Sequence, residues 1–258
     1  MSELNLVGRT FIVAGAAGLL GSQIVAGLMA HGANVYALDF SRAKLDELKK
    51  KWKDDERLSC AVIDISKVEE IEDVFRLASE KYGAVHGAVN TTYPRNANYG
   101  SKFFDVSYAD FCENISLNLG CYFIFMQACA RYFQGSKDDF SLVNISSVYG
   151  VTTPRFEVYE GTNMTMPVEY SAIKSALIHL SKYVAAYVKS SGFRVNLVSP
   201  GGILDGQPED FLNAYKEHTL GAGMLTAPDM VGSILFLLSD MSRYINGQNI
   251  IVDDGFTL

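Results

Sequence analysis

The chain has 258 residues, enough for one large domain or two small ones. Hydrophobic residues make up 48% of it and charged residues 20%, a balance that is typical of a globular protein and excludes a disordered one. The formal net charge is −7 and the 22 basic residues are spread along the chain, so the sequence argues against a nucleic-acid partner.

Strand-like and helix-like segments alternate almost from the start. Seven apolar runs predict strands, at 10–14, 34–38, 58–63, 85–90, 140–146, 194–199 and 249–252. Helical spacing predicts helices at 22–30, 41–53, 66–82, 107–133, 170–190 and 227–239, with a short one inside 201–226. Two of these helices begin with a serine followed three residues later by an acid, which predicts capping boxes at Ser66–Glu69 and Ser107–Asp110.

Strands that alternate with helices pair in parallel, because each crossover returns the chain to the same end of the sheet. We therefore expect an α/β protein, with a single-domain Rossmann fold over residues 1–258. Its sheet should be doubly wound, mostly parallel and seven-stranded, with helices on both faces. Ligands of such folds bind beyond the carboxyl ends of the strands. Two long loops, 91–106 and 147–169, follow strands and should lie at that end.

The cysteines and the apolar runs bear on metals, membranes and location. No Cys-x-x-Cys pair occurs, so we expect no metal site, and we expect Cys121 and Cys129 to be buried thiols. The first ten residues carry no apolar signal core, and no apolar run reaches the roughly 18 residues of a membrane span. We expect a cytoplasmic protein that does not contact a membrane.

A glycine-rich turn connects the first strand to the first helix. Gly15, Gly18 and Gly21 leave the backbone open, so a pyrophosphate can approach the N–H groups at the start of the helix. Asp39 ends the second strand, where a carboxylate can accept hydrogen bonds from the adenosine ribose and repels a 2′-phosphate. The pattern favours NAD over NADP. A strand-end or capping role for Asp39 is the alternative, and Arg42 is close enough in sequence to neutralise part of its charge.

Tyr170 and Lys174 are four residues apart, on one face of a predicted helix. The pKa of a phenol is near 10, and a neighbouring cation lowers it toward the range of acid–base catalysis. This spacing is common by chance. It gains weight here because it follows a long loop, downstream of Ser146 and Ser147 at a strand end.

With these motifs the chain resembles the classical short-chain dehydrogenase/reductase family over nearly its whole length. The resemblance implies that Tyr170 donates or accepts the proton and that Lys174 lowers the pKa of Tyr170 and binds the nicotinamide ribose. It implies that Ser147, or else Ser146, holds the substrate oxygen.

The same resemblance supplies the remaining site residues. An asparagine of the fourth helix supports a relay water, and Asn118 matches it better than Asn114 does. The expected catalytic set is Asn118, Ser147, Tyr170 and Lys174. The expected NAD-binding residues are Gly15, Ala17, Gly18, Leu19, Leu20, Gly21, Asp39, Phe40, Asp64, Ile65, Asn90, Thr91, Tyr170, Lys174, Pro200, Gly201 and Ile203.

Three departures from the family pattern stand out. The glycine spacing is that of the extended branch, which acts on nucleotide sugars, because Leu19 stands where the middle glycine is expected. Asn90-Thr91-Thr92-Tyr93 replaces the family's Asn-Asn-Ala-Gly. The segment between Ser147 and Tyr170 is about ten residues longer than usual. With the 93–96 loop and the glycine turn, this insertion resembles the flagellin modification protein A group, which is associated with legionaminic-type sugar synthesis.

The sequence thus predicts an NAD(H)-dependent oxidoreductase that transfers a hydride to or from an alcohol or ketone. Polar residues in the two loops favour a polar, sugar-like or sugar-phosphate-like substrate, unless they are merely solvated or contact another subunit; they are Arg95, Asn96, Lys102, Arg155, Glu157, Tyr159, Glu160 and Asn163. One alternative is a sugar epimerase or dehydratase with tightly held NAD, and another is a silent dinucleotide sensor or scaffold. We expect a homo-oligomer, a dimer or tetramer, with the helix at 117–133 and the last strand either at its interface or in the subunit core.

Overall fold

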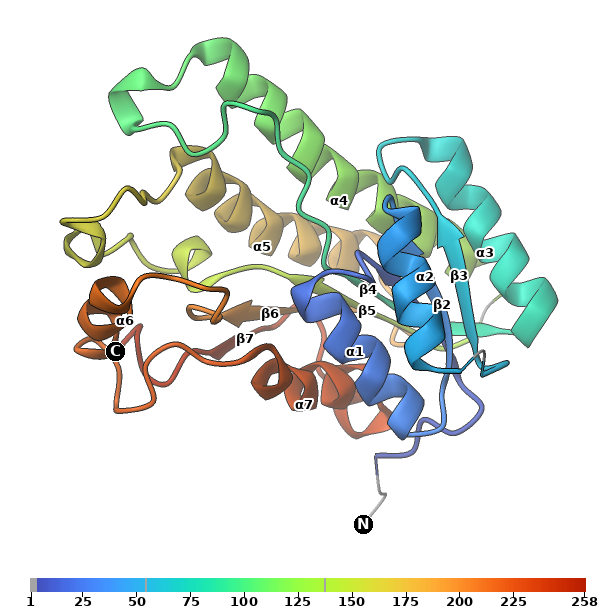
Figure 1. The fold of residues 1–258 in the computed structure, drawn as a ribbon. Coiled ribbons are helices and arrows are strands. Elements are labelled where there is room, and N and C mark those ends of the chain that lie inside the picture. Colours follow the sequence, from blue (N-terminus) through green and yellow to red (C-terminus); the bar gives the residue numbers. More distant parts are fainter. Residues whose placement is uncertain (1–3, 54, 137) are drawn as a thin grey trace.

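The computed structural model describes residues 4–53, 55–136 and 138–258 (Figure 1). Its strands form one seven-stranded sheet of order β3-β2-β1-β4-β5-β6-β7, and every neighbouring pair is parallel. The strands are β1 (Thr10–Ala14), β2 (Asn34–Asp39), β3 (Leu58–Val62), β4 (Val85–Asn90), β5 (Phe140–Ile145), β6 (Phe193–Pro200) and β7 (Asn249–Val252). This order is doubly wound, with its switch point between β1 and β4. The predicted Rossmann class is confirmed, and the sheet is wholly parallel.

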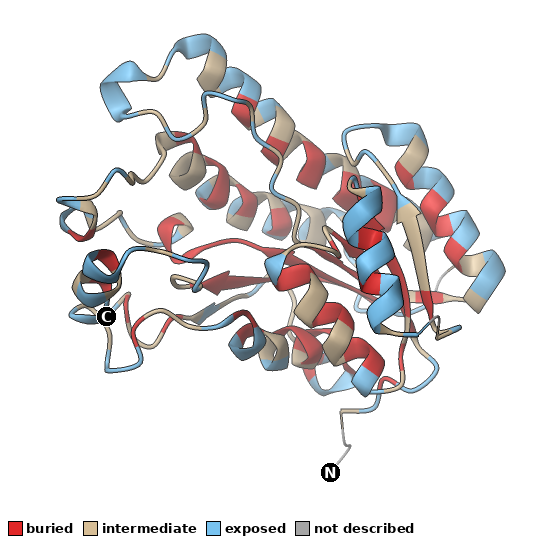
Figure 2. Cartoon of the chain, viewed as in Figure 1, coloured by how far each residue is buried: buried red, intermediate tan, exposed pale blue. Residues whose placement is uncertain are grey.

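Three helices cover each face of the sheet (Figure 1). One face packs against α1 (Leu19–Ala30), α2 (Arg42–Lys51) and α7 (Ala227–Leu238). The other packs against α3 (Val68–Tyr82), α4 (Tyr108–Ser136) and α5 (Val168–Val188). Figure 2 shows the buried residues concentrated in the central strands and on the helix sides that face them. Strands that are covered by helices on both faces consist of continuous apolar residues. These apolar runs allowed the strands to be predicted from the sequence.

The two predicted capping boxes have different outcomes. Asp110 accepts a hydrogen bond from the Ser107 hydroxyl at 2.5 Å, and its backbone N–H donates to that hydroxyl at 3.0 Å, so the serine-to-acid start of α4 is confirmed. The box at Ser66 is wrong. The Ser66 hydroxyl donates to Asp64 at 2.7 Å instead, and α3 starts from Lys67 without a side-chain cap.

The insertion between β5 and α5 is a structured part of the carboxyl edge. It contains two 3-10 turns, η2 (Val148–Gly150) and η3 (Phe156–Tyr159), and it packs against α6 (Glu209–Lys216) and the C-terminal residues. In Figure 1 this yellow segment lies beside the orange α6. An apolar cluster joins them, formed by Val148, Tyr149, Val158, Phe211, Tyr215 and Phe256.

The middle of α4 belongs to the subunit core. Tyr122, Phe125 and Met126 are fully buried, so the core alternative holds for these three residues and they do not form an interface. Cys121 and Cys129 are buried as expected. Within the described residues, no helix has both the length and the apolar character that crossing a bilayer requires.

Candidate active site

The glycine turn has no room for a side chain at Gly15 or at Gly21. Gly15 has a φ of +77°, and a Cβ on it would lie 2.6 Å from the Thr91 hydroxyl. A Cβ on Gly21 would lie 2.0 Å from the Gly15 carbonyl oxygen, so α1 packs directly against the turn. Gly18 is the N-cap of α1, which has neither a side-chain cap nor an acid in its first turn. The amides at Leu19 and Leu20 therefore form a cradle that suits a phosphate group.

Asp39 lies beside this turn at the end of β2. Its carboxylate is 8% exposed and accepts hydrogen bonds from the backbone N–H of Ala17 at 3.1 Å and of Ser41 at 3.0 Å. Thr91 fixes the other side of the turn, because its hydroxyl donates to the carbonyls of Ala14 and Gly15. The carboxylate thus holds the turn and also faces the edge where the fold class binds ligands.

The other expected cofactor residues also lie at the carboxyl edge. Asn90, at the end of β4, is fully buried, and its side-chain N–H₂ has no partner among the described residues. Asp64 follows β3 and is exposed; hydrogen bonds from Ser66 lower the pKa of its carboxyl. Phe40 is 81% exposed and Ile65 is half-buried.

The turn after β6 is built around Tyr215 of α6. The N–H of Gly202 donates to the Tyr215 hydroxyl at 2.6 Å, and a Cβ on Gly201, which follows Pro200, would lie 2.9 Å from that hydroxyl. Ile203 forms a parallel bridge with Leu225, and its carbonyl accepts a hydrogen bond from the Gln207 side chain. The Ile203 carbonyl therefore already has a partner in this structure.

The structure brings Ser147, Tyr170 and Lys174 together at the carboxyl end of β5. Ser147 is 5% exposed and lies beside Tyr170, close enough to act on its phenol. Lys174 is 4% exposed, and its Nζ donates to the Ile145 carbonyl at 2.8 Å. Nζ also lies 5.6 Å from the centre of the Tyr170 ring. Helical spacing on α5 therefore places the phenol and the ammonium side by side.

Burial controls the protonation of this pair. Burial raises the pKa of Tyr170, and the hydrogen bond with Ser147 acts in the opposite direction. Burial alone lowers the pKa of Lys174 to about 7. Ser147 thus acts to lower the pKa of the phenol, and the lowering that the sequence led us to expect from Lys174 stays a prediction.

Two pairs of alternatives are separated by their hydrogen bonds. The Ser146 hydroxyl donates to the Lys174 carbonyl at 2.9 Å and so holds the helix, which leaves Ser147 as the serine beside the phenol. Asn114 has both side-chain ends engaged, with Asn96 and with Glu169. Asn118 donates to the Pro94 carbonyl, but its buried side-chain oxygen has no partner in the part of the chain that the structure describes. That oxygen is suited to hold a water, as the relay role requires.

Sequence reasoning missed three residues around Tyr170. The Tyr93 ring packs edge-on against the Tyr170 ring at 5.6 Å, and the hydroxyls of Tyr93 and Tyr99 are 2.5 Å apart. Glu169 is fully buried, and one of its carboxylate oxygens has no partner among the described residues. Of these three residues, only Tyr93 could have been found from the sequence. There a large aromatic ring replaces the glycine of the resembled family's Asn-Asn-Ala-Gly motif.

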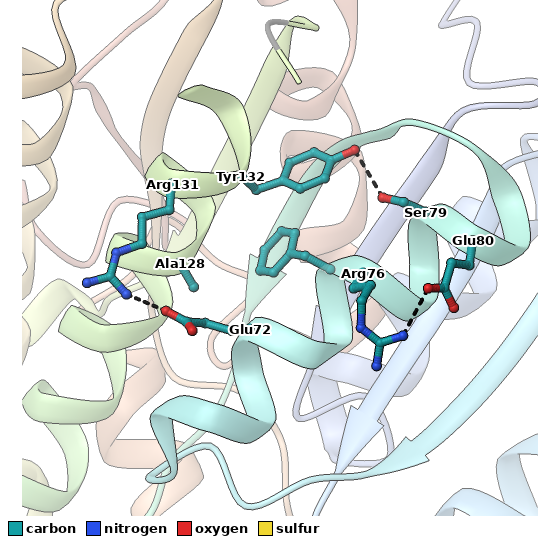
Figure 3. Close-up of a pocket in the computed structure, with 8 residues that line it drawn as sticks. Glu72, Arg76, Ser79, Glu80, Ala128, Arg131 and Tyr132 are labelled. Atoms are coloured by element: carbon teal, nitrogen blue, oxygen red, sulfur yellow. Dashed lines mark hydrogen bonds and ion pairs between the residues drawn. The ribbon is translucent and has the colours of Figure 1, made fainter. Parts of the chain in front are cut away.

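A groove of about 710 Å³ lies elsewhere, between α3 and the last third of α4 (Figure 3). Arg131 pairs with Glu72 across it, and Ser79 donates to Tyr132 at 3.2 Å. None of the expected catalytic residues lines this groove, and Asn118 lies nearer the other end of α4.

Comparisons with known proteins agree with this geometry. A family model described as enoyl-(acyl carrier protein) reductase matches residues 15–257. A post-translational flagellin modification protein A of Campylobacter coli is 34% identical over 98% of this chain and 100% of its own. A 7alpha-hydroxysteroid dehydrogenase of Bacteroides fragilis is 27% identical over 97% of this chain and 95% of its own. A short-chain dehydrogenase of Leptospira borgpetersenii, solved with bound NAD⁺, has a TM-score of 0.88 and 28% identity; the match covers 100% of this chain and 97% of that one.

The parallel sheet, the glycine turn and the Ser–Tyr–Lys group define a class of α/β oxidoreductases with a dinucleotide fold. The chain belongs to the short-chain dehydrogenase/reductase family of that class.

Proposed function

We propose that the protein transfers a hydride between NAD(H) and a carbon of a polar, sugar-like substrate that carries a hydroxyl or keto group. The observation that carries this proposal is the placement of Ser147, Tyr170 and Lys174 at the same edge of the sheet as the glycine turn and Asp39. When bound, the nicotinamide supplies the hydride acceptor or donor.

The protein's own groups divide the remaining work. Ser147 holds the substrate oxygen by a hydrogen bond. The Tyr170 hydroxyl, which lies beside Ser147, gives that oxygen a proton in the reductive direction and takes it back in the oxidative direction. Lys174 holds the nicotinamide ribose, and a water on the free oxygen of Asn118 returns the proton to solvent.

Asp39 favours NAD over NADP in this proposal. Its carboxylate, fixed by Ala17 and Ser41, ends β2 at the position where this fold contacts the adenosine ribose. A 2′-phosphate placed there meets a like charge in a largely buried setting, which weakens its binding. Arg42 begins α2 one residue beyond Ser41 and is exposed to solvent, where its charge is screened.

The rim favours a polar and partly anionic substrate. Arg95 stacks on the Tyr93 ring at 5.1 Å, and Arg155 lies 5.4 Å from the Phe256 ring. No carboxylate pairs with either guanidinium among the described residues. Asn96, by contrast, has its amide engaged by Asp110 and Glu113, so we do not assign it to the substrate. The relative named for flagellin modification agrees with a sugar-like substrate.

We also propose a homo-oligomeric, cytoplasmic protein. The outer sides of α4 and α5 expose large aromatic rings, with Phe123 46%, Tyr183 58% and Tyr187 74% exposed. Tyr183 and Tyr187 stack on each other at 6.0 Å, which makes a flat apolar surface suited to a two-fold contact. All four cysteines are free, in keeping with a reducing compartment.

The proposal is tested by incubating the protein with NAD⁺ and a panel of sugars, sugar phosphates and nucleotide sugars while following the absorbance of reduced nicotinamide. At least one polar alcohol should be oxidised, and Tyr170→Phe should reduce that turnover by at least about 100-fold with NADH affinity unchanged. Retained turnover in Tyr170→Phe would refute the assignment of the proton to Tyr170. Tight NADH binding with no oxidised substrate would favour the sensor or scaffold.

A further inference from the structure

An aromatic enclosure surrounds the Lys174 ammonium. Its Nζ lies 5.2 Å from the centre of the Tyr122 ring, 5.6 Å from that of Tyr170 and 5.8 Å from that of Tyr93. The fourth neighbour is the Ile145 carbonyl, which accepts its hydrogen bond. Among the described residues no carboxylate pairs with the ammonium, and burial is the cause of its lowered pKa. Tyr122 and Tyr170 come from the helices α4 and α5, whereas Tyr93 comes from a loop.

The loop after β4 therefore contributes Tyr93 to this aromatic enclosure. Its ring meets the Tyr170 ring edge-on, with an interplanar angle of 89°. The geometry restricts rotation of the Tyr170 ring, because the edge of one ring prefers the face of the other. Tyr93 is 37% exposed, so one side of its ring still faces the solvent at the rim of the site.

The loop that carries Tyr93 is firmly held. Tyr99 meets Tyr93 edge-on at 5.7 Å and shares the short hydrogen bond between the hydroxyls. The backbone N–H of Asn96 donates to Asn114 of α4 at 3.0 Å, and Asn114 donates to Glu169 at 3.3 Å. Glu169 directly precedes Tyr170 on α5. The same network thus ties the loop to the two helices that carry the acid–base group and its supporting asparagine.

We propose that Tyr93, fixed by Tyr99, is a positioning residue for the Tyr170–Lys174 pair and forms the wall of the substrate site on that side. The ring excludes water from the ammonium and sets the direction of the phenol. Its exposed side narrows the site beside the phenol, so Tyr93 also limits which substrates reach it. The positioning role needs only the protein; its effect on turnover rests on the proposed dehydrogenase function.

The first test measures Lys174 without using turnover. Lysines are labelled with acetic anhydride across a pH series, and mass spectrometry gives the extent of labelling at Lys174. In the wild type, half-maximal reactivity should fall near the lowered pKa of about 7. Tyr93→Gly admits water, so the midpoint should move to higher pH, toward that of an ordinary lysine, and labelling well above the midpoint should be faster.

Two control variants separate the effect of losing the Tyr93 ring from the effects of losing its hydroxyl and of a tyrosine-to-glycine change elsewhere. Tyr93→Phe keeps the ring and should label as the wild type does. Tyr244→Gly makes the same change at a residue that is 87% exposed and should not alter labelling of Lys174. An unchanged midpoint and rate in Tyr93→Gly, with the fold intact by circular dichroism, would overturn the proposal whether or not a substrate is known.

With a substrate in hand, a second test follows turnover. Tyr93→Gly should lower kcat by about tenfold, since a misplaced acid–base group loses rate, and should change KM less. It should also accept substrates with bulkier groups near the reacting carbon. An equal loss in Tyr93→Phe would show that the hydroxyl, and not the ring, acts there, and would contradict the positioning role of the ring.

Discussion

Asp39 shows how one carboxylate serves both structure and cofactor choice. It accepts two backbone hydrogen bonds, from Ala17 of the glycine turn and from Ser41, the N-cap of α2. Asp39→Asn removes the negative charge. It keeps the size of the side chain and one oxygen that can still accept a backbone hydrogen bond. The ratio of NADH to NADPH affinity, measured by fluorescence titration, should therefore fall by about tenfold, since the repulsion of a 2′-phosphate is lost.

Arg42→Ala is the matched control for this measurement. If Arg42 lies in solvent and does not neutralise Asp39, the variant should leave the affinity ratio within about twofold of the wild type, because screened surface charges contribute little. An unchanged ratio in Asp39→Asn would show that the carboxylate only holds the turn.

Residues were predictable where a motif fixes both type and spacing. Gly15, Asp39, Tyr170 and Lys174 all lie at the sheet edge where the pattern placed them. The environment of Tyr170 was not predictable, because Tyr93 approaches from a loop 77 positions earlier in the sequence and no periodicity links them. The relation between the pKa values of Tyr170 and Lys174 depends on burial, which only the folded chain shows.

At the scale of elements, the site depends on the close packing of α1 against the glycine turn, where Gly21 contacts the Gly15 backbone. Gly21→Ala would place a Cβ 2.0 Å from the Gly15 carbonyl oxygen, and backbone cannot move aside as a flexible side chain does. The free energy of unfolding, measured with urea, should fall by about 1–3 kcal/mol, and NADH affinity should fall with it. Gly232→Ala, in the exposed side of α7 with open space around it, should instead stabilise by up to about 1 kcal/mol. Equal stability of the two variants would contradict the close packing of α1.

Elements with strong periodicity were predicted correctly, and only their ends differ from the prediction by a few residues. The helix expected at 107–133 extends to Ser136, and the one expected at 170–190 is α5, Val168–Val188. The Ser66 box failed because Asp64, two residues earlier, competes for the serine hydroxyl. The insertion was expected to be an irregular loop, whereas its 3-10 turns form through packing against α6, a contact that local sequence does not encode.

At the scale of the whole molecule, the buried Lys174 makes stability depend on pH. Its pKa is about 7 in the folded chain and near 10.4 in an unfolded one. Between these values the unfolded chain holds more protons, so this residue makes the free energy of unfolding rise with pH. From pH 7 to 9 that rise should be smaller in Lys174→Met by about 2 kcal/mol, measured with urea. The same rise in both proteins would mean that Lys174 is not dehydrated.

The order of strands and helices was the most predictable property of the molecule, because each strand is an apolar run and each connection a crossover. The insertion, with η2 and η3, packs against α6 at the carboxyl edge. It carries Arg155, whose guanidinium lies 5.4 Å from the Phe256 ring. The rim is the part of the molecule that selects the substrate in our proposal.

The central claim is a net hydride transfer with Tyr170 as the proton donor or acceptor. The most direct measurement is the amount of NADH formed per molecule of product, with the substrate that the panel identifies and with NAD⁺ in excess. We predict one NADH for each oxidised product in the wild type and no detectable turnover in Tyr170→Phe. Product formed without net NADH would contradict the claim and would identify an epimerase or dehydratase that recycles a tightly held NAD.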